Sequence, residues 1–174
     1  MTDALVPGGS REQKLEAWLT AYGDAVLRMC FIYLADRQLA EDALQDTFLK
    51  AWRRMDSCEA RSGASAKTWI MRIAINTCKD YRRSAWFRHV DMEKAIEDIP
   101  LAAPDVSGES RALFLDVMRL PPKLKQVILL YHFHNLTMAE TAGILHISRQ
   151  AVQYRLKKAY QLLGSLPERS LRDE

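Results

Sequence analysis

Apolar residues recur every three or four positions in several stretches of this chain, a spacing that places them on one face of a helix. In the first half the pattern covers residues 14–34, 38–55 and 66–83, and Gly23 is a weak point of the first stretch. In the second half it resumes at Leu113, stops at Pro121 and restarts at Pro122, a favoured first-turn position. The chain is therefore predicted to be all-α.

The periodic pattern breaks between residues 88 and 110. This segment is rich in Asp and Glu, and Pro100, Pro104 and Gly108 interrupt it. It predicts a flexible acidic linker between two small helical domains, residues 14–87 and 111–174. Residues 1–13 are small and polar and contain Gly and Pro, which indicates a mobile N-terminal arm, and residues 55–65 read as a loop.

Residues 135–163 are typical of a helix-turn-helix. Thr137 and Glu140 form a capping box, so the first helix should start at the next residue after Thr137, and Ser148 should cap the second helix. His146 occupies the turn position that usually carries Gly, where a positive φ is expected. The inner face of the first helix is predicted to be small enough for a close crossing and consists of Ala139, Ala142 and Leu145.

The second of these helices has one apolar stripe and an opposite stripe without carboxylates. Arg and Gln can form bidentate bonds to base edges, and Lys and Tyr can hold phosphates. The pattern favours DNA binding, and the alternative is a solvated basic face on an ordinary helical hairpin. The stripe predicted to face the core is Val152, Leu156, Ala159 and Leu163. The candidate DNA-binding residues are Arg149, Gln150, Gln153, Tyr154, Arg155, Lys157 and Lys158.

Two further polar stripes lie in the first half. One is acidic and ends in apolar residues, which suggests a surface for a partner or else a solvated face; it consists of Asp42, Gln45, Asp46, Leu49 and Trp52. The other is basic and consists of Lys67, Arg72, Asn76, Lys79, Arg82 and Arg83. Aromatic residues accompany it at Trp69, Tyr81, Trp86 and Phe87, although Tyr81 also falls on the inward face. Basic and aromatic residues together are expected where bases stack and phosphates are neutralised; the alternative is an exposed basic helix with core aromatics.

Composition excludes several classes of protein. The 174 residues are 48% hydrophobic, which is enough for real cores. The net charge of +3 is small, so any affinity for nucleic acid depends on where the charge sits. No apolar run approaches the roughly 20 residues that span a bilayer, and the first ten residues lack the features of a signal peptide, so a cytoplasmic protein without membrane insertion is expected.

Metal and cofactor chemistry is not indicated. Cys30, Cys58 and Cys78 are odd in number and far apart in the sequence, and none belongs to a C-x-x-C motif. His132 and His134 are two positions apart on a predicted helix, so they should point in different directions. No metal site, cofactor or catalytic residue is therefore predicted, and a metalloenzyme is the least favoured reading.

Four motifs together resemble bacterial sigma factors of the extracytoplasmic-function type, the small class that carries only sigma regions two and four. They are EDALQDTFLKAW at 41–52, W-I-x-x-I-A-x-N-x-x-x-D-x-x-R at 69–83, L-P-P-K-x-x-x-V-x-x-L at 120–130, and T-x-A-E-x-A-x-x-L-x-I-S-x-x-A-V-x-x-R-L-x-x-A at 137–159. Each motif alone is modest, but their order around an acidic segment is specific. One departure is Ala66, where family members often carry an aromatic residue.

The resemblance implies a partner for each stripe. The stripe from Asp42 to Trp52 would bind the clamp helices of the β′ subunit of core RNA polymerase, and apolar residues around Val127 and Leu130 would lie near the β flap. The basic stripe would read and hold open the downstream promoter element, with an extruded base received by the loop at 57–67. The helix-turn-helix would read the upstream element as a duplex, the linker would follow the RNA path, and an anti-sigma factor would sequester the protein.

The function implied is that of a dissociable subunit that directs RNA polymerase to promoters and helps melt them, without catalysis of its own. The alternative is a stand-alone helix-turn-helix regulator whose N-terminal half binds a ligand or a second protomer. The two hypotheses differ in one respect: the regulator should bind duplex DNA tightly without polymerase, whereas the sigma factor should need the acidic stripe for transcription.

Overall fold

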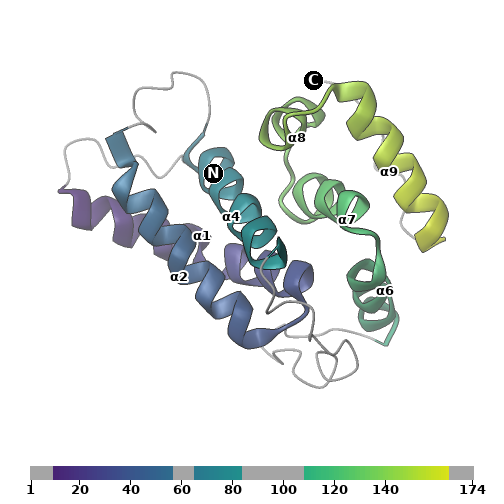
Figure 1. Ribbon diagram of the computed structural model, residues 1–174, viewed down its shortest axis with the longest axis horizontal. Helices are drawn as coiled ribbons and strands as arrows, with labels where there is room; N and C mark the ends of the chain where they lie inside the picture. The colour runs from purple at the N-terminus through teal and green to yellow at the C-terminus, as the bar shows by residue number, and fades with distance from the viewer. Residues whose placement is uncertain (1–9, 57–64, 84–107, 165–174) are drawn as a thin grey trace. The chain divides into compact units, whose positions relative to one another are not determined.

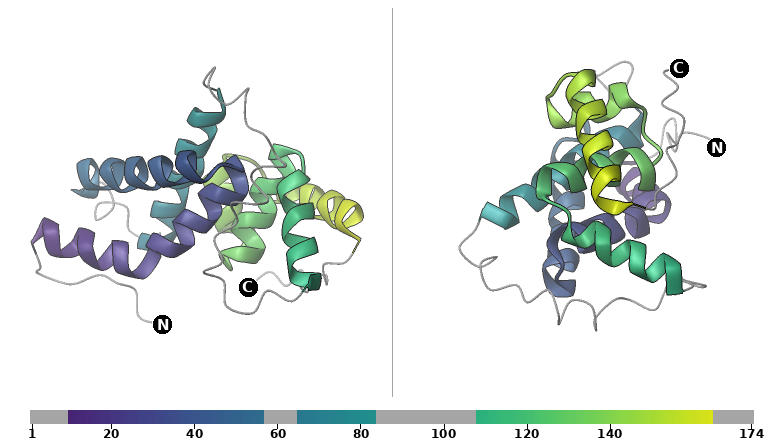
Figure 2. Two further views of the ribbon diagram at one scale, coloured as in Figure 1. Left: turned by 90° about the horizontal axis from the view of Figure 1, so that it is seen from below. Right: turned by 90° about the vertical axis from the view of Figure 1, so that its right-hand side faces the viewer.

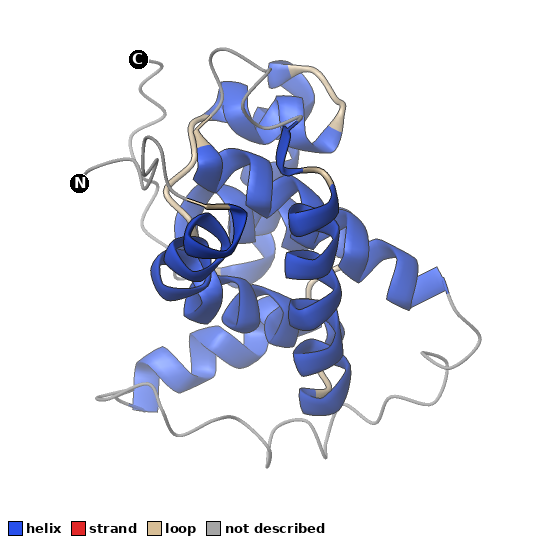
Figure 3. Ribbon diagram, turned by 90° about the vertical axis from the view of Figure 1, so that its left-hand side faces the viewer, coloured by secondary structure: helices blue, strands red, loops and turns tan. Residues whose placement is uncertain are grey.

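The computed structural model describes residues 10–56, 65–83 and 108–164, and within these ranges the regular structure is helical throughout (Figure 1; Figure 3). The predicted fold class is confirmed. Residues 1–9, most of the predicted loop at 55–65 and most of the predicted linker lie outside the described residues. The chain divides into two compact units, residues 1–90 and 91–174, which we call the N-terminal and C-terminal units.

The described part of the N-terminal unit is a bundle of three helices, α1 (Arg11–Leu34), α2 (Arg37–Arg53) and α4 (Ala66–Arg83), each packed on the other two (Figure 2). The rings of Trp18 and Trp69 meet in the core with their centroids 5.6 Å apart. The largest fully buried side chains of the bundle are Trp18, Met29, Ile32, Leu34, Met55, Ile70, Met71 and Ile75.

The start of α1 corrects one prediction. Ser10 accepts a hydrogen bond from the Gln13 amide, and the Gln13 side chain accepts one from the Ser10 amide at 2.9 Å. This capping box satisfies donors that the first turn would otherwise leave unpaired, so the helix begins at Arg11 and not at Lys14. Residues 11–13 therefore belong to the bundle and not to an N-terminal arm.

The described part of the C-terminal unit consists of α6 (Gly108–Arg119), α7 (Pro122–Ile128), a π-helical turn η2 (Leu129–Phe133), α8 (Met138–Leu145) and α9 (Arg149–Leu163). Helix α7 packs on α9, and α8 packs on both α9 and η2. Helix α7 starts at Pro122 as predicted. Helix α6 begins at Gly108, inside the segment predicted to be a linker, and the π-helical turn was not predicted.

The helix-turn-helix is confirmed, including both of its predicted caps. Thr137 Oγ1 accepts from the Glu140 amide at 3.1 Å, and Glu140 Oε2 accepts from the Thr137 amide at 2.8 Å. Ser148 Oγ accepts from the Ala151 amide at 3.1 Å. His146 adopts the left-handed conformation, with φ 54°, and its amide bonds the Ala142 carbonyl, which closes α8 without a glycine.

The inner face of α8 differs from the prediction. Ala142 and Leu145 are buried as expected, but Ala139 is exposed. Met138 and Thr141 are buried instead, and together these positions follow the spacing i, i+3, i+4 and i+7 of a single helix face. The predicted inner face of α8 therefore differs from the observed one by a shift of about one residue along the helix.

Candidate partner and nucleic-acid interfaces

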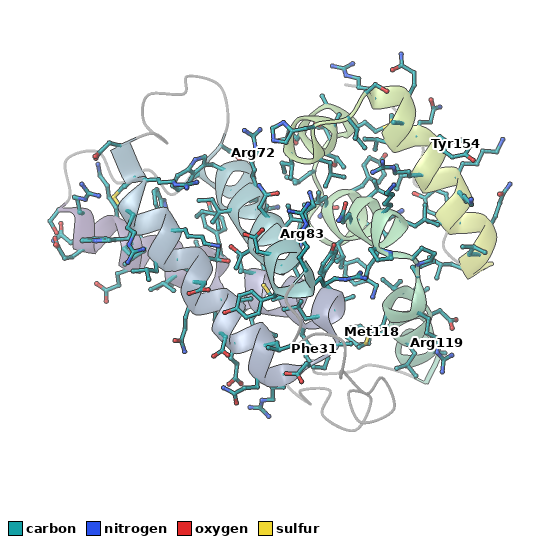
Figure 4. All side chains as sticks on the ribbon, viewed as in Figure 1. Phe31, Arg72, Arg83, Met118, Arg119 and Tyr154 are labelled. Atoms are coloured by element: carbon teal, nitrogen blue, oxygen red, sulfur yellow. The ribbon has the colours of Figure 1, made fainter. Side chains whose placement is uncertain are left out.

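Helix α9 presents its predicted DNA-binding side chains to solvent. Tyr154 is 67% exposed and extends from the side of α9 away from α7 (Figure 4). Arg155 is half-buried at the flank. The helix contains no Asp or Glu, so its outer surface carries only positive formal charge. The exposed members of the predicted set are Arg149, Gln150, Gln153, Tyr154, Lys157 and Lys158.

The opposite face of α9 anchors the helix along its whole length. Val152, Leu156 and Ala159 are fully buried, and Leu163 is buried in the last turn, as predicted. Gly164 ends the helix at φ 63°, a conformation that glycine adopts without steric cost. Because the buried apolar stripe, together with the hydrogen bond between Tyr160 and His132, fixes α9 on its unit, the exposed polar face remains available to a ligand.

Helix α4 carries the second basic stripe, but its side chains are less free. Only Arg83 is exposed (Figure 4). Lys79 Nζ lies 3.5 Å from Asn76 Oδ1, and the guanidinium of Arg82 lies 5.6 Å from the centroid of the Tyr33 ring. The half-buried members of the set are Lys67, Arg72, Asn76, Lys79 and Arg82. All six nevertheless reach the surface of one helix, as the periodicity predicted.

Of the aromatic residues near α4 that were predicted to stack on bases, the structure describes Trp69 and Tyr81. Trp69 is buried against Trp18 and is only 6% exposed, so it is unavailable for stacking on a base and that prediction is wrong. Trp86 and Phe87 lie outside the described residues. The helix begins at the buried Ala66, and Ser65 Oγ accepts a hydrogen bond from the Thr68 amide at 3.2 Å.

Tyr81 links the two stripes of the N-terminal unit. It was predicted to face inward, but it is half-buried and its hydroxyl donates a hydrogen bond to Asp46 Oδ2 at 3.0 Å. Burial raises the pKa of Tyr81 to about 12, and the hydrogen bond to Asp46 and the charge of that carboxylate contribute to the shift. The phenol is therefore neutral at physiological pH and acts as a donor.

The acidic stripe lies on the surface of α2. Gln45 and Leu49 are exposed, and Asp42, Asp46 and Trp52 are half-buried. Leu49 is 46% exposed near the C-terminal end of α2, one turn from the half-buried Trp52, so the two form a partly exposed apolar pair. The stripe is therefore compatible with a partner surface and does not belong to the core.

An apolar groove between α1 and α2 adjoins this stripe. It has a volume of about 430 Å³, and Glu12 and Glu16 line it together with apolar side chains. Leu19, from α1, is 42% exposed there. The apolar lining residues are Leu15, Leu19, Phe48, Leu49 and Trp52. The α1 side of this groove was not predicted from the sequence. Leu19 lies off the core stripe of its helix, and this position could have indicated an exposed apolar side chain.

Arg11 packs across the end of the same groove. Its guanidinium lies 5.2 Å from the centroid of the Trp52 ring and donates to the Trp52 carbonyl at 2.7 Å. The same guanidinium forms an ion pair with Asp56 at 3.4 Å. The first turn of α1, absent from the predicted domain, therefore helps to place Trp52.

The described cysteines and two of the histidines lie in or beside the cores of their own units. Cys30 and Cys78 are distant in sequence, but their Sγ atoms lie 3.4 Å apart and both thiols are buried. The hydrogen bond to Cys30 and burial raise the pKa of the Cys78 thiol, so it stays protonated. His132 Nε2 hydrogen-bonds the Tyr160 hydroxyl, whereas His134 is buried. Among residues 10–56, 65–83 and 108–164, no three His, Cys, Asp or Glu side chains are grouped so that they could hold a metal ion.

Two other structural features concern partners. Val127 and Leu130 are fully buried in the core of the C-terminal unit, so the contact of this region with the β flap stays a prediction for the side chains around them. Of the large apolar side chains in the described part of that unit, Phe133 and Leu162 are exposed.

In the part of the chain that the structure describes, no helix combines the length and the hydropathy needed to cross a bilayer.

Comparisons with known proteins agree with the two-unit architecture. Residues 18–88 match the model of Sigma-70 region 2, and residues 117–163 match that of Sigma-70, region 4. The RNA polymerase sigma-E factor of Streptomyces avermitilis is 30% identical over 151 residues, which cover 84% of this chain and 80% of the relative. The ECF RNA polymerase sigma factor SigM of Bacillus subtilis is 27% identical over 161 residues, covering 88% of this chain and 94% of SigM.

The fold is also known from solved structures. The sigma factor RpoE from Bartonella quintana has a TM-score of 0.68 and 19% sequence identity, and the match covers 88% of this chain and 95% of RpoE. The chain belongs to the sigma-70 family of RNA polymerase sigma factors, in its extracytoplasmic-function (ECF) class. Members of this family are DNA-binding transcription initiation factors, which associate with core RNA polymerase.

Proposed function

We propose that this sigma factor places core RNA polymerase on promoters through three separate surfaces, with α2 binding the polymerase, α4 the downstream element and α9 the upstream element. The observation that carries this proposal is the exposed, carboxylate-free face of α9 above a fully buried apolar stripe. A helix anchored in this way can enter a major groove without rearrangement of its unit. The segment at 88–110 would join the two domains, and the protein would act in the cytoplasm without catalysis of its own.

The polymerase-binding role rests on the surface of α2. Leu49 is exposed beside Gln45 and next to the apolar groove, and Asp42 and Asp46 supply negative charge. An apolar centre with an acidic border fits a basic amphipathic partner. By the family resemblance, the partner at this surface is the clamp helices of the β′ subunit. We extend the proposed surface to Leu19, because it lines the same groove.

The test is promoter-dependent run-off transcription with core polymerase. Asp46→Arg should abolish most of the transcript, because it reverses the charge at the centre of the surface. Asp42→Arg is the companion variant, since Asp46 also bonds Tyr81. Asp24→Arg makes the same chemical change at an exposed position of α1 outside the groove and should leave transcription unchanged. Full activity of both stripe variants would contradict binding through α2.

Exposed partner surfaces also support regulation by an anti-sigma factor. The RpoE structure from Bartonella quintana is a complex with the anti-sigma factor NepR. By analogy, we propose that an anti-sigma factor covers the α2 surface of this chain in uninduced cells. Affinity capture of the chain from its native host, with and without Leu49→Arg, tests this. The prediction fails if no protein depends on Leu49 for capture, or if the chain is constitutively active.

A further inference from the structure

The apolar core does not hold the C-terminal end of α4. Buried residues recur along the helix from Ala66 to Cys78, and none of residues 79–83 is buried. This last turn carries Arg82 and Arg83, two of the proposed DNA-binding cations. The Arg82 guanidinium lies 5.6 Å from the centroid of the Tyr33 ring of α1, and polar contacts fix the rest of this turn relative to the bundle.

Hydrogen bonds and an ion pair join α2 to this end of α4. The Tyr81 hydroxyl donates to Asp46 Oδ2 at 3.0 Å. One turn along α2, Lys50 Nζ donates to Thr77 Oγ1 at 3.0 Å and lies 3.7 Å from the carboxylate of Asp80. Because the later residue of α2 bonds the earlier part of α4, the two links run in antiparallel order and tie the helices side by side.

The two links differ in strength. Lys50 also donates a charge-assisted hydrogen bond to Thr77, but Thr77 lies before the last turn of α4. Within that turn Lys50 meets only Asp80, in a solvent-exposed pair with 37% and 62% of the side-chain surfaces accessible, which contributes little. The Tyr81–Asp46 bond is partly buried and joins a neutral phenol to a carboxylate, the kind of hydrogen bond that is shorter and stronger than a neutral pair. Tyr81 is thus the main polar anchor of the last turn of α4 on α2.

We propose that Tyr81 is a positioning residue, which holds Arg82 and Arg83 in place for promoter DNA by bonding Asp46 of the polymerase-binding stripe. This inference rests on the proposed function, because it takes α2 as the polymerase surface and α4 as a DNA surface. It gives Asp46 two separable tasks. Its charge serves the polymerase surface, and one of its oxygens orients the DNA-binding helix.

The experiment uses the full chain with core polymerase at saturating concentration and a promoter duplex that is already melted downstream. Tyr81→Phe removes only the hydroxyl and should weaken DNA binding by the complex about tenfold, because a hydrogen bond to a charged group is lost. The affinity of the chain for core polymerase, measured by competition, should stay unchanged. A residue with a purely structural role would not separate these two affinities.

Substitutions of Asp46 make the test specific. Asp46→Asn keeps an oxygen acceptor, so Tyr81→Phe should still weaken DNA binding in that background. Asp46→Ala removes the acceptor, so the same change should then have no further effect. Tyr160→Phe is the matched control, because it removes a hydrogen-bonded hydroxyl from the C-terminal unit. Its effect should be the same whatever residue occupies position 46.

Four results would overturn the inference: unchanged DNA binding by Tyr81→Phe, a loss of polymerase affinity, an equal effect in the Asp46→Ala background, or a chain unfolded at the assay temperature. The last would show that the hydroxyl supports the whole bundle and not one turn. Absence of promoter-dependent transcription by the wild-type chain would instead refute the proposed function, so the two failures are distinguishable.

Discussion

Helices α4 and α9 both carry basic stripes proposed to meet DNA, but the protein holds them in different ways. Under α9 the apolar stripe continues into the last turn at Leu163, and most of the polar face is exposed. Under α4 the apolar stripe ends at Cys78, and most of the basic side chains are half-buried, with Arg82 against the Tyr33 ring of α1 and Lys79 beside Asn76 of its own helix. A stripe anchored by apolar contacts is independent of its neighbours, whereas a stripe anchored by polar contacts depends on adjacent surfaces.

The largest effect on stability is expected when the buried apolar stripe beneath α9 is shortened. Leu156→Ala removes a side chain with no exposed surface and should cost the C-terminal unit about 2–5 kcal/mol of stability. Far-UV circular dichroism should show a separate early melting transition. All four tryptophans lie in the first 90 residues, so the tryptophan fluorescence transition should not move.

The matched variant is Leu162→Ala, the same change at a neighbouring position that is 59% exposed. It should alter stability by no more than about 0.5 kcal/mol. Equal destabilisation by both variants would show that burial under α9 is not what anchors this helix.

The next effect concerns the two kinds of contact proposed for α9. Gln153→Ala should relax base preference at one upstream position, at a cost of about 1–3 kcal/mol for the preferred base. Lys157→Ala should weaken all promoter sequences about equally and flatten the salt dependence. Transcription from a library of upstream sequences at several salt concentrations separates these outcomes. Identical profiles for the two variants would contradict the assignment of Gln153 to a base edge.

A smaller effect is expected at the start of the helix-turn-helix. Thr137→Ala removes the side-chain acceptor of the Glu140 amide and should cost the C-terminal unit about 1 kcal/mol. Thr137→Ser keeps the acceptor and is expected to retain most of that stability. The midpoint of urea unfolding followed by circular dichroism provides the measurement, and a Ser variant as unstable as the Ala variant would exclude the cap as the cause.

The smallest effects on stability are expected at two glycines, one in each unit. Gly23 lies inside α1 with open space around its Cβ position, so Gly23→Ala should stabilise the N-terminal unit by about 0.5–1 kcal/mol. Gly164 also has open space, but its φ of 63° disfavours any side chain, so Gly164→Ala should destabilise the C-terminal unit. Tryptophan fluorescence reports the first change and circular dichroism the second, and shifts of the same sign would contradict this account.

The difference between the helices also explains which features were predictable from the sequence. The stripe beneath α9 and the N-caps of the helix-turn-helix are local patterns, so Val152, Leu156 and the Thr137 capping box of α8 were all identified correctly. The bond between Tyr81 and Asp46 joins residues 35 positions apart, and nothing in the local pattern of either helix indicates it. The same holds for the neighbouring thiols of Cys30 and Cys78.

Mistaken predictions of which side chains are buried or exposed have a related cause. Trp69 is an apolar residue beside a proposed DNA surface, and a sequence pattern does not show which side of a helix another helix covers. It proved to be a core residue, packed against Trp18. Leu19 was missed for the opposite reason, because its exposure depends on the groove that α1 forms with α2.

We propose that this protein reads promoters only as part of a complex with polymerase. The most direct test is the affinity for a promoter duplex, selected by transcription from a random library, measured with the chain alone and with the chain bound to core polymerase. The account predicts weak, non-specific binding by the chain alone and specific protection of two separate DNA segments by the complex. Tight and specific binding by the chain alone, unchanged by polymerase, would contradict it and favour a stand-alone regulator.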